Sequence, residues 1–205
     1  MKKYLPLLPV FYLLFASFCT PKITAEEKNA QQLRLETKSA EALAYCKKNN
    51  LSTAYCVLID MKMHSGKKRA YLWDFKKDTV ALAGMCSHGC CSNPWGETTT
   101  KSNPSFSNVP DSHCSSLGKY KVGARGYSSW GIHVNYKLLG LEATNSNAFK
   151  REIVLHSWEE VPGEEVYPVG IPEGWGCPAV SNVFMATLDS KLKSSEIPVL
   201  LWIFN

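Results

Sequence analysis

Two residues in the C-terminal part of the chain have side chains suited to nucleophilic catalysis. Cys177 lies in the run GWGCPAV, residues 174–180, and His156 lies 21 residues earlier in IVLHSW, residues 153–158. A cysteine attacks a carbonyl carbon as its thiolate, and a nearby histidine takes the thiol proton and returns it to the leaving group. The pair therefore predicts a cysteine nucleophile with a histidine base, provided that the fold brings the two side chains together.

The residues around Cys177 also suit the negative charge that develops on an attacked carbonyl oxygen. Gly174 and Gly176 allow the backbone to approach a substrate closely, and the N–H groups of Gly176 and Cys177 are the expected oxyanion donors. Pro178 has no N–H to add to this hole. A helix expected to begin near Ser181 would further stabilise a thiolate at its N-terminal end.

These side chains need a rigid support, and the sequence predicts a mainly β domain with peripheral helices. Residues 26–50 contain no Gly or Pro and place apolar residues at helical spacing, which predicts an N-terminal helix. Residues 87–113 are rich in Ser, Asn, Pro and Gly, which predicts a long loop of the kind that often has a function. The other predicted elements are strands at 54–61, 69–75, 79–87, 131–139, 151–158 and 197–204, a β-ribbon within 115–130, and a helix at 180–192.

The first 25 residues are typical of a secretory signal peptide. An apolar stretch from Tyr4 to Phe18 follows two lysines, and it is too short and too interrupted by proline to span a membrane. We expect cleavage after about Ala25. A lipoprotein signal with Cys19 as the lipidated residue is the less favoured alternative, because the bulky Phe18 precedes it. The predicted organisation is a signal peptide at 1–25, a helical segment at 26–50 and the main domain at 51–205.

Cleavage changes both the charge and the cysteine count. The formal net charge falls from +5 to +2, because Lys2, Lys3 and Lys22 are removed without any acidic residue. That balance is not typical of a nucleic-acid-binding protein. Seven cysteines remain, and an odd number in an oxidising compartment predicts a free thiol. If Cys177 is that thiol, up to three disulfides can form among Cys46, Cys56, Cys86, Cys90, Cys91 and Cys114.

Structural roles for the cysteines and histidines compete with chemical ones in two places. Cys177 can instead be half of a disulfide, with His156 a hydrogen-bonded histidine at the end of a strand. The run CSHGCC at residues 86–91 has metal-binding residue types, but zinc sites use wider and paired spacing. We therefore predict disulfides rather than a metal site in this run.

Several ordered motifs together resemble the murein L,D-transpeptidase catalytic domain family, which comprises bacterial envelope enzymes that form 3→3 peptidoglycan crosslinks. IVLHSW followed by GWGCPAV is similar to the branch with a His, a loop and then Ser-Trp-Gly-Cys-Pro-Ala-Val. The resemblance covers about residues 55–205. Its upstream motifs are Phe106-Ser107-Asn108, Ser115-Ser116-Leu117-Gly118-Lys119-Tyr120, Gly140-Leu141-Glu142 and Asn145-Ser146-Asn147-Ala148.

This resemblance implies a fold and a reaction. The fold would be an L,D-transpeptidase-like β-sandwich or mixed sheet domain. Cys177 would attack the carbonyl that joins the third residue of a peptidoglycan tetrapeptide to its terminal D-alanine, and an amine from a neighbouring stem peptide would resolve the thioester. His156 would act as base and acid, and Gly176 and Cys177 would form the oxyanion hole. The implied location is the periplasm or the bacterial envelope, with no metal and no organic cofactor.

Five further residues are candidates for contact with the stem peptide: Trp175, Ser157, His88, Tyr120 and Ser116. Trp175, Trp158 and Tyr120 are candidates for the walls of the substrate cleft, with packing in the core as the alternative. His88 resembles a histidine at the end of the family's third strand. Gly174 departs from the family, which has a serine there. Ser157 departs as well, because this branch often has glycine at that position.

Two alternative functions stay open on the sequence, which also leaves the oligomeric state open. Water in place of the amine would make the protein an L,D-carboxypeptidase that trims tetrapeptides to tripeptides. A non-catalytic, disulfide-stapled peptidoglycan-binding domain is the alternative of another class.

Overall fold

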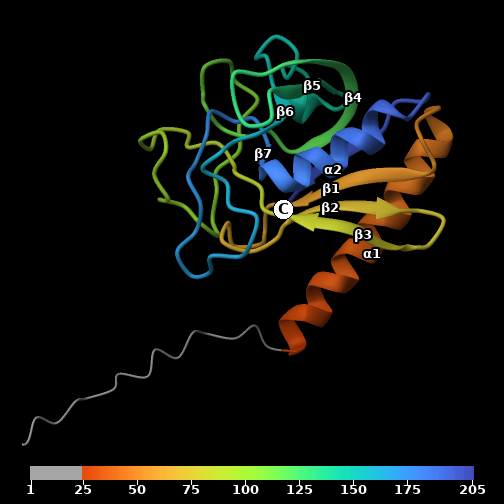
Figure 1. The fold of residues 1–205 in the computed structure, drawn as a ribbon, viewed down its shortest axis with the longest axis horizontal. Helices are drawn as coiled ribbons and strands as arrows, with labels where there is room; N and C mark the ends of the chain where they lie inside the picture. The colour runs from red at the N-terminus through yellow and green to blue at the C-terminus, as the bar shows by residue number, and fades with distance from the viewer. Residues whose placement is uncertain (1–24) are drawn as a thin grey trace, which may run out of the picture.

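The structure is a computed structural model that describes residues 25–205, and its main feature is a curled sheet of eight strands (Figure 1). The strand order is β3-β2-β1-β8-β4-β5-β6-β7. The predicted signal peptide and Cys19 lie outside the described residues. The strands are β1 (Tyr55–Asp60), β2 (Ala70–Asp74), β3 (Thr79–Gly84), β4 (Gly118–Tyr127), β5 (Val134–Gly140), β6 (Val154–Ser157), β7 (Ala179–Val180) and β8 (Leu200–Phe204).

The C-terminal strand holds the two halves of the sheet together. β8 pairs in parallel with β1 and antiparallel with β4, so the last residues of the chain lie in the middle of the sheet. The two edges also approach each other, since Cys86, just after β3, forms an antiparallel bridge with Val180 of β7. The mixed sheet is therefore almost closed into a barrel.

Two helices cover opposite faces of the central strands (Figure 1). The long helix α1 (Ala25–Lys48) packs Leu35, Ala42 and Cys46 against one face, and α2 (Asn182–Lys193) packs on the other. Successive residues of a strand point to opposite faces, so a strand covered on both sides must be apolar throughout. This explains the unbroken apolar run of β8.

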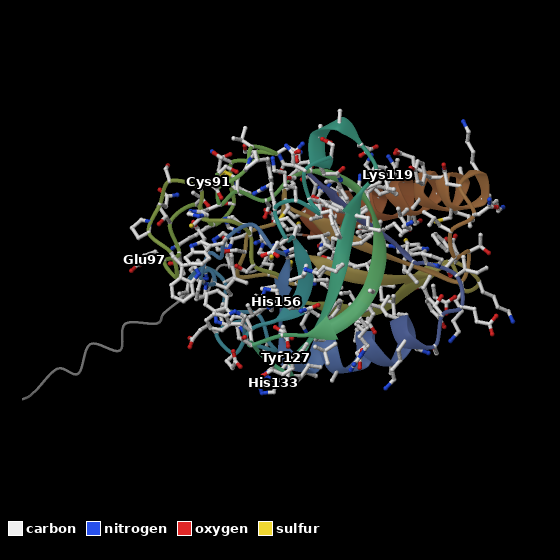
Figure 2. All side chains as sticks on the ribbon, turned by 90° about the horizontal axis from the view of Figure 1, so that it is seen from above. Cys91, Glu97, Lys119, Tyr127, His133 and His156 are labelled. Atoms are coloured by element: carbon white, nitrogen blue, oxygen red, sulfur yellow. A yellow bond between two sulfur atoms is a disulfide. The ribbon has the colours of Figure 1, made fainter. Side chains whose placement is uncertain are left out.

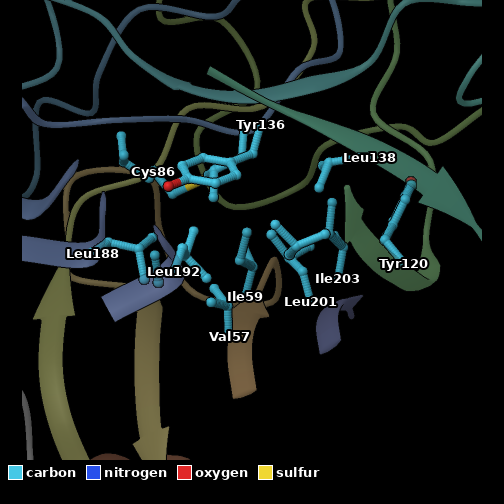
Figure 3. Close-up of a cluster of buried hydrophobic side chains, with 14 of the residues drawn as sticks. Val57, Ile59, Cys86, Tyr120, Tyr136, Leu138, Leu188, Leu192, Leu201 and Ile203 are labelled. Atoms are coloured by element: carbon cyan, nitrogen blue, oxygen red, sulfur yellow. The ribbon is translucent and has the colours of Figure 1, made fainter. Parts of the chain in front are cut away.

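The core beneath α2 is shown in Figure 3, where Leu188 and Leu192 point toward Val57 and Ile59 of β1. The helix begins at an N-cap, Ser181, whose side chain accepts a hydrogen bond from the N–H of Phe184. Burial of these side chains is the main force that seats α2 on the sheet.

The predicted fold class, mainly β with peripheral helices and an N-terminal helix, is confirmed. Two short elements were missed. One is the 3₁₀ turn Ala143–Asn145, and the other is β7, whose two residues pair in parallel with β6 and delay the start of α2 to Asn182. Among the described residues, no helix is long and apolar enough to cross a membrane.

The cysteines form fewer disulfides than the sequence allows. Within residues 25–205 the structure contains one disulfide, Cys91–Cys114, which closes the long loop between β3 and β4. Cys177 is free, as the catalytic hypothesis requires, but it is not the only free thiol. The other free cysteines, all buried, are Cys46, Cys56, Cys86 and Cys90.

We expect the contact of α2 with the core to be essential for stability. Leu188 is fully buried, so Leu188→Ala should lower the free energy of unfolding by about 2–5 kcal/mol through lost burial and a cavity. Val183→Ala, on the exposed side of the same helix, should change it by less than about 0.5 kcal/mol. Urea denaturation measures both values, and equal effects would contradict the packing of α2.

Candidate active site

Pairing between β6 and β7 brings His156 and Cys177 into one site. His156 lies opposite Ala179 in this parallel pair, and Cys177 is two residues before Ala179. Figure 2 shows His156 at the side of the sheet where the loops that carry Cys91 and Glu97 gather. The side chains of His156 and Cys177 face one cavity of about 270 Å³. Its lining residues are Trp95, Trp130, His156, Trp158, Gly174, Trp175, Cys177 and Ala179.

The imidazole of His156 is held in one tautomer. Its Nδ1 lies 2.9 Å from the backbone oxygen of Ser157. A carbonyl oxygen only accepts hydrogen bonds, so Nδ1 carries the proton and Nε2 keeps its lone pair. Burial lowers the pKa of His156, although the Ser157 carbonyl and Glu159 oppose that effect. The ring is therefore neutral at pH 7 and able to accept a proton.

The sulfur of Cys177 lies against the start of β6. Its Sγ accepts a hydrogen bond from the N–H of Val154 at 3.4 Å and lies 4.0 Å from the carbonyl oxygen of Glu152. Burial raises the pKa of the Cys177 thiol, and the Val154 N–H, Arg151 and Lys137 partly oppose this effect. The thiol is thus protonated at neutral pH and needs a base to become a nucleophile.

The turn before Cys177 requires glycine. Gly176 has φ +95°, and a Cβ on it would lie 2.5 Å from the backbone oxygen of Cys114. Arg151 fixes the segment behind this turn, since its guanidinium donates to the oxygens of Cys114 and Ser107 at 2.6 and 2.9 Å. Among the described residues, the N–H groups of Gly176 and Cys177 have no hydrogen-bond acceptor. They remain available to a ligand.

Four of the six tryptophans of the chain wall the cavity, and sequence reasoning missed two of them, Trp95 and Trp130. The ring of Trp95 is central, because it stacks on Trp158 at 5.4 Å and lies 6.1–6.3 Å from Trp175 and Trp130. The sequence did contain a pattern that marks three of these four tryptophans. Trp95, Trp130 and Trp175 each precede a glycine, and all three glycines have positive φ in the structure.

A comparison with protein-family models matches residues 25–202 to the L,D-transpeptidase catalytic domain. The chain belongs to this family. The match confirms the expected family and the L,D-transpeptidase-like fold class, and it includes the N-terminal helix α1. A search of the curated proteins finds no match.

Solved structures show distant similarity to this L,D-transpeptidase-family chain. The helical cell shape determining protein Pgp2 from Campylobacter jejuni is 11% identical, with a TM-score of 0.45, and the alignment covers 82% of this chain and 55% of that one. The Ldtfm–avibactam carbamoyl enzyme is 13% identical, with a TM-score of 0.40, and the alignment covers 74% and 49%. The chain thus spans about half the length of these proteins.

Of the five predicted substrate-contact residues of this L,D-transpeptidase domain, only one lines the cavity. Trp175 lines it and is 62% exposed. Ser157 contributes its carbonyl to His156, but its hydroxyl is buried and accepts from the N–H of Ile132.

Ser116 and Tyr120 are buried behind the site rather than in it. The Tyr120 hydroxyl donates to the carbonyl of Ser116 at 2.7 Å, and the Ser116 hydroxyl accepts from Arg151 at 2.7 Å. Neither side chain lines the cavity. The arrangement indicates that they support Arg151, which in turn holds the segment against Gly176.

His88 is also buried. It belongs to a chain of hydrogen bonds, the polar chain, that runs from Arg69 through His88 and Thr100 to Glu173. The residues at its two ends decide which group donates in each of these hydrogen bonds. Arg69 can only donate, so Nδ1 of His88 accepts from it at 2.7 Å and Nε2 carries the proton toward Thr100 at 2.6 Å. Thr100 then donates to a carboxylate oxygen of Glu173 at 3.0 Å. Glu173 directly precedes Gly174, whose N–H donates to the backbone oxygen of His88 at 2.8 Å.

The run CSHGCC therefore has a structural arrangement that the sequence did not specify. Cys91 forms the disulfide, Cys86 and Cys90 are free and buried, and His88 belongs to the polar chain. In residues 25–205, no three His, Cys, Asp or Glu side chains lie together as a metal site would require.

The polar chain predicts a pH dependence of stability. Burial, and next the charge of Arg69, lower the pKa of His88 to about 3, so the folded protein keeps His88 neutral where an unfolded chain protonates it. The contribution of a neutral His88 to the free energy of unfolding is therefore complete above the unfolded pKa near 6.5. As the pH falls from there toward the folded pKa, this contribution decreases by about 1.4 kcal/mol per pH unit.

His88→Gln should remove that contribution. Urea denaturation between pH 6.5 and 4.5 should show a stability difference between wild type and variant that shrinks as the pH falls. A difference that is constant over this range would contradict a neutral buried His88.

Proposed function

We propose that the protein is a cysteine-dependent murein L,D-transpeptidase that works in the periplasm or bacterial envelope. The observation that carries the proposal is the placement of Cys177 and a neutral, tautomer-fixed His156 in one cavity beside two unpartnered backbone N–H groups. The family match supports peptidoglycan as the substrate.

In the proposed acylation step, Cys177 Sγ attacks the carbonyl carbon that precedes the terminal D-alanine of a tetrapeptide. The thiol proton passes to Nε2 of His156 and then to the nitrogen of D-alanine, which leaves as a free amino acid. The N–H groups of Gly176 and Cys177 stabilise the oxyanion. The product is a thioester on Cys177.

In the proposed transfer step, an amine of a neighbouring stem peptide attacks the thioester. The C–N bond forms, the C–S bond breaks, and the sulfur recovers a proton through His156. The apolar indoles around the cavity favour an amine over water, because water gains few hydrogen bonds there.

Muropeptide analysis tests this proposal. The mature protein incubated with tetrapeptide muropeptides should yield crosslinked dimers and free D-alanine, and mass spectrometry should detect the acyl group on Cys177. Cys177→Ala should lower product formation by at least about a thousandfold, as for other nucleophile deletions. Cys46→Ala, which removes a buried thiol far from the cavity, should retain activity.

The outcomes separate the candidate functions. Tripeptides without dimers would identify an L,D-carboxypeptidase. An active Cys177→Ala protein, or the absence of any acyl-enzyme, would overturn the proposed nucleophile.

Thiol alkylation supplies an independent prediction. Cys177 is half-buried and free, whereas the other four free cysteines are buried, so iodoacetamide should modify Cys177 first. Because burial raises the pKa of this thiol, the alkylation rate should keep rising with pH through and above pH 9. Peptide mapping after short labelling measures the site and the rate. A resistant, disulfide-bonded Cys177 would favour the non-catalytic binding domain.

A further inference from the structure

The tryptophan cavity has a chemical character that the acylation step does not explain. None of its lining residues carries a formal charge, yet four indoles surround it. A cation is attracted to the face of an indole, whereas a carboxylate buried here would lose hydration without a partner. The cavity walls therefore favour an apolar or cationic group over an anionic one.

An acidic side chain lies close in the structure to the backbone that carries two wall residues of this cavity. Glu159 is exposed and directly follows the wall residue Trp158, and its Oε1 accepts a hydrogen bond from the N–H of Gly131 at 2.6 Å. That bond holds the carboxylate at Gly131, the residue that follows the wall residue Trp130. Its charge also reaches His156. The negative charge of Glu159 therefore favours a positively charged ligand near this part of the wall.

The opposite side of Trp175 has the reverse character. A second hollow there is lined by Lys150, Arg151, His113 and Asp111, together with Pro110 and the same Trp175. Trp175 lines both hollows, and its indole stacks on the ring of His113 at 5.4 Å. Anionic parts of a substrate are thus attracted to this second hollow, where the cationic Lys150 and Arg151 outnumber the acidic Asp111.

From these three observations we propose that the cavity walled by Trp95, Trp130, Trp158 and Trp175 binds the aliphatic ammonium arm of the acceptor. Its volume of about 270 Å³ is just below the range usual for small-molecule sites, which suits one side-chain-sized arm rather than a whole peptide. The methylenes pack on the indoles, and the ammonium lies between indole faces and Glu159. The tryptophans are then specificity-determining residues for transfer.

This inference rests on the proposed function, because the arm reacts only with an acyl-enzyme. The bound ammonium loses one proton, the neutral nitrogen attacks the thioester carbon, and the Cys177 sulfur leaves. The products are an amide and the free thiol. One proton is released to solvent for each ammonium consumed.

Binding is tested first, without any reaction. The mature, full-length protein is titrated with Nα-acetyl-lysine amide while the six indole N–H signals are followed by NMR. The signals of Trp95, Trp130, Trp158 and Trp175 should shift, and those of Trp73 and Trp202, which lie in the cluster beneath α1, should not. The uncharged analogue Nα-acetyl-norleucine amide should bind at least about fivefold more weakly, as expected for a cation–π contribution.

Kinetics then assign the role to the tryptophans. Trp95→Leu and Glu159→Gln should each raise the KM for the acceptor amine about five- to tenfold, and shift products from crosslinked dimers toward tripeptides. Acylation by a donor alone should change less than about threefold. Trp95→Phe, which keeps an aromatic face, should recover part of the acceptor affinity. Phe149→Leu removes an exposed ring outside the cavity lining and should match wild type.

The results distinguish the inference from the function on which it rests. If wild type forms no acyl-enzyme, the proposed function fails. If it does, but norleucine amide binds as well as the lysine amide, or Trp95→Leu leaves the acceptor KM unchanged, the ammonium site is wrong. Loss of affinity in Glu159→Gln alone would also overturn the role of the indoles.

Discussion

The parallel pairing of β6 with β7 is the constraint on which the site depends. It consists of two residue pairs, His156 with Ala179 and Ser157 with Val180. So short a strand cannot hold its place through its own hydrogen bonds. It is held because Val180 also bridges to Cys86 and because α2 begins immediately afterwards, with buried Phe184 and Leu188 in the core. The near-closure of the sheet therefore sets the position of Cys177 relative to His156.

The polar chain from Arg69 to Glu173 anchors the segment that precedes Cys177. Burial of a guanidinium is costly unless its donors are satisfied, and Arg69 has partners in the carbonyls of Cys86 and Met63 and in His88. Each hydrogen bond beyond Arg69 has only one allowed direction. An incorrect register of the loop would leave a buried donor facing a donor. The network therefore specifies one conformation for the segment that leads into Gly174 and Cys177.

The sequence was informative where one local pattern determines the outcome. The apolar runs predicted the strands. Residues 26–50 predicted α1, because they lack Gly and Pro and place apolar residues at helical spacing, and such periodicity reports burial directly. His88 and Ser116 were assigned to substrate contact because their polar side chains follow family motifs. Their burial depends on partners far along the chain, namely Arg69 and Arg151, which no local pattern reveals. The disulfide Cys91–Cys114 was not predictable for the same reason, since several pairings satisfy the count.

The electrostatics of the site favour a neutral resting state. Burial raises the pKa of the Cys177 thiol and lowers that of His156, so both shifts oppose a thiolate–imidazolium pair. In the proposed mechanism, proton transfer would therefore accompany attack, when the Gly176 and Cys177 N–H groups would begin to stabilise negative charge on the substrate. A thiol that ionises only with substrate present also resists oxidation, because the thiolate is the form that oxidants and disulfides attack. In the oxidising compartment that the sequence predicts, the burial that keeps the Cys177 thiol protonated would thus slow its oxidation.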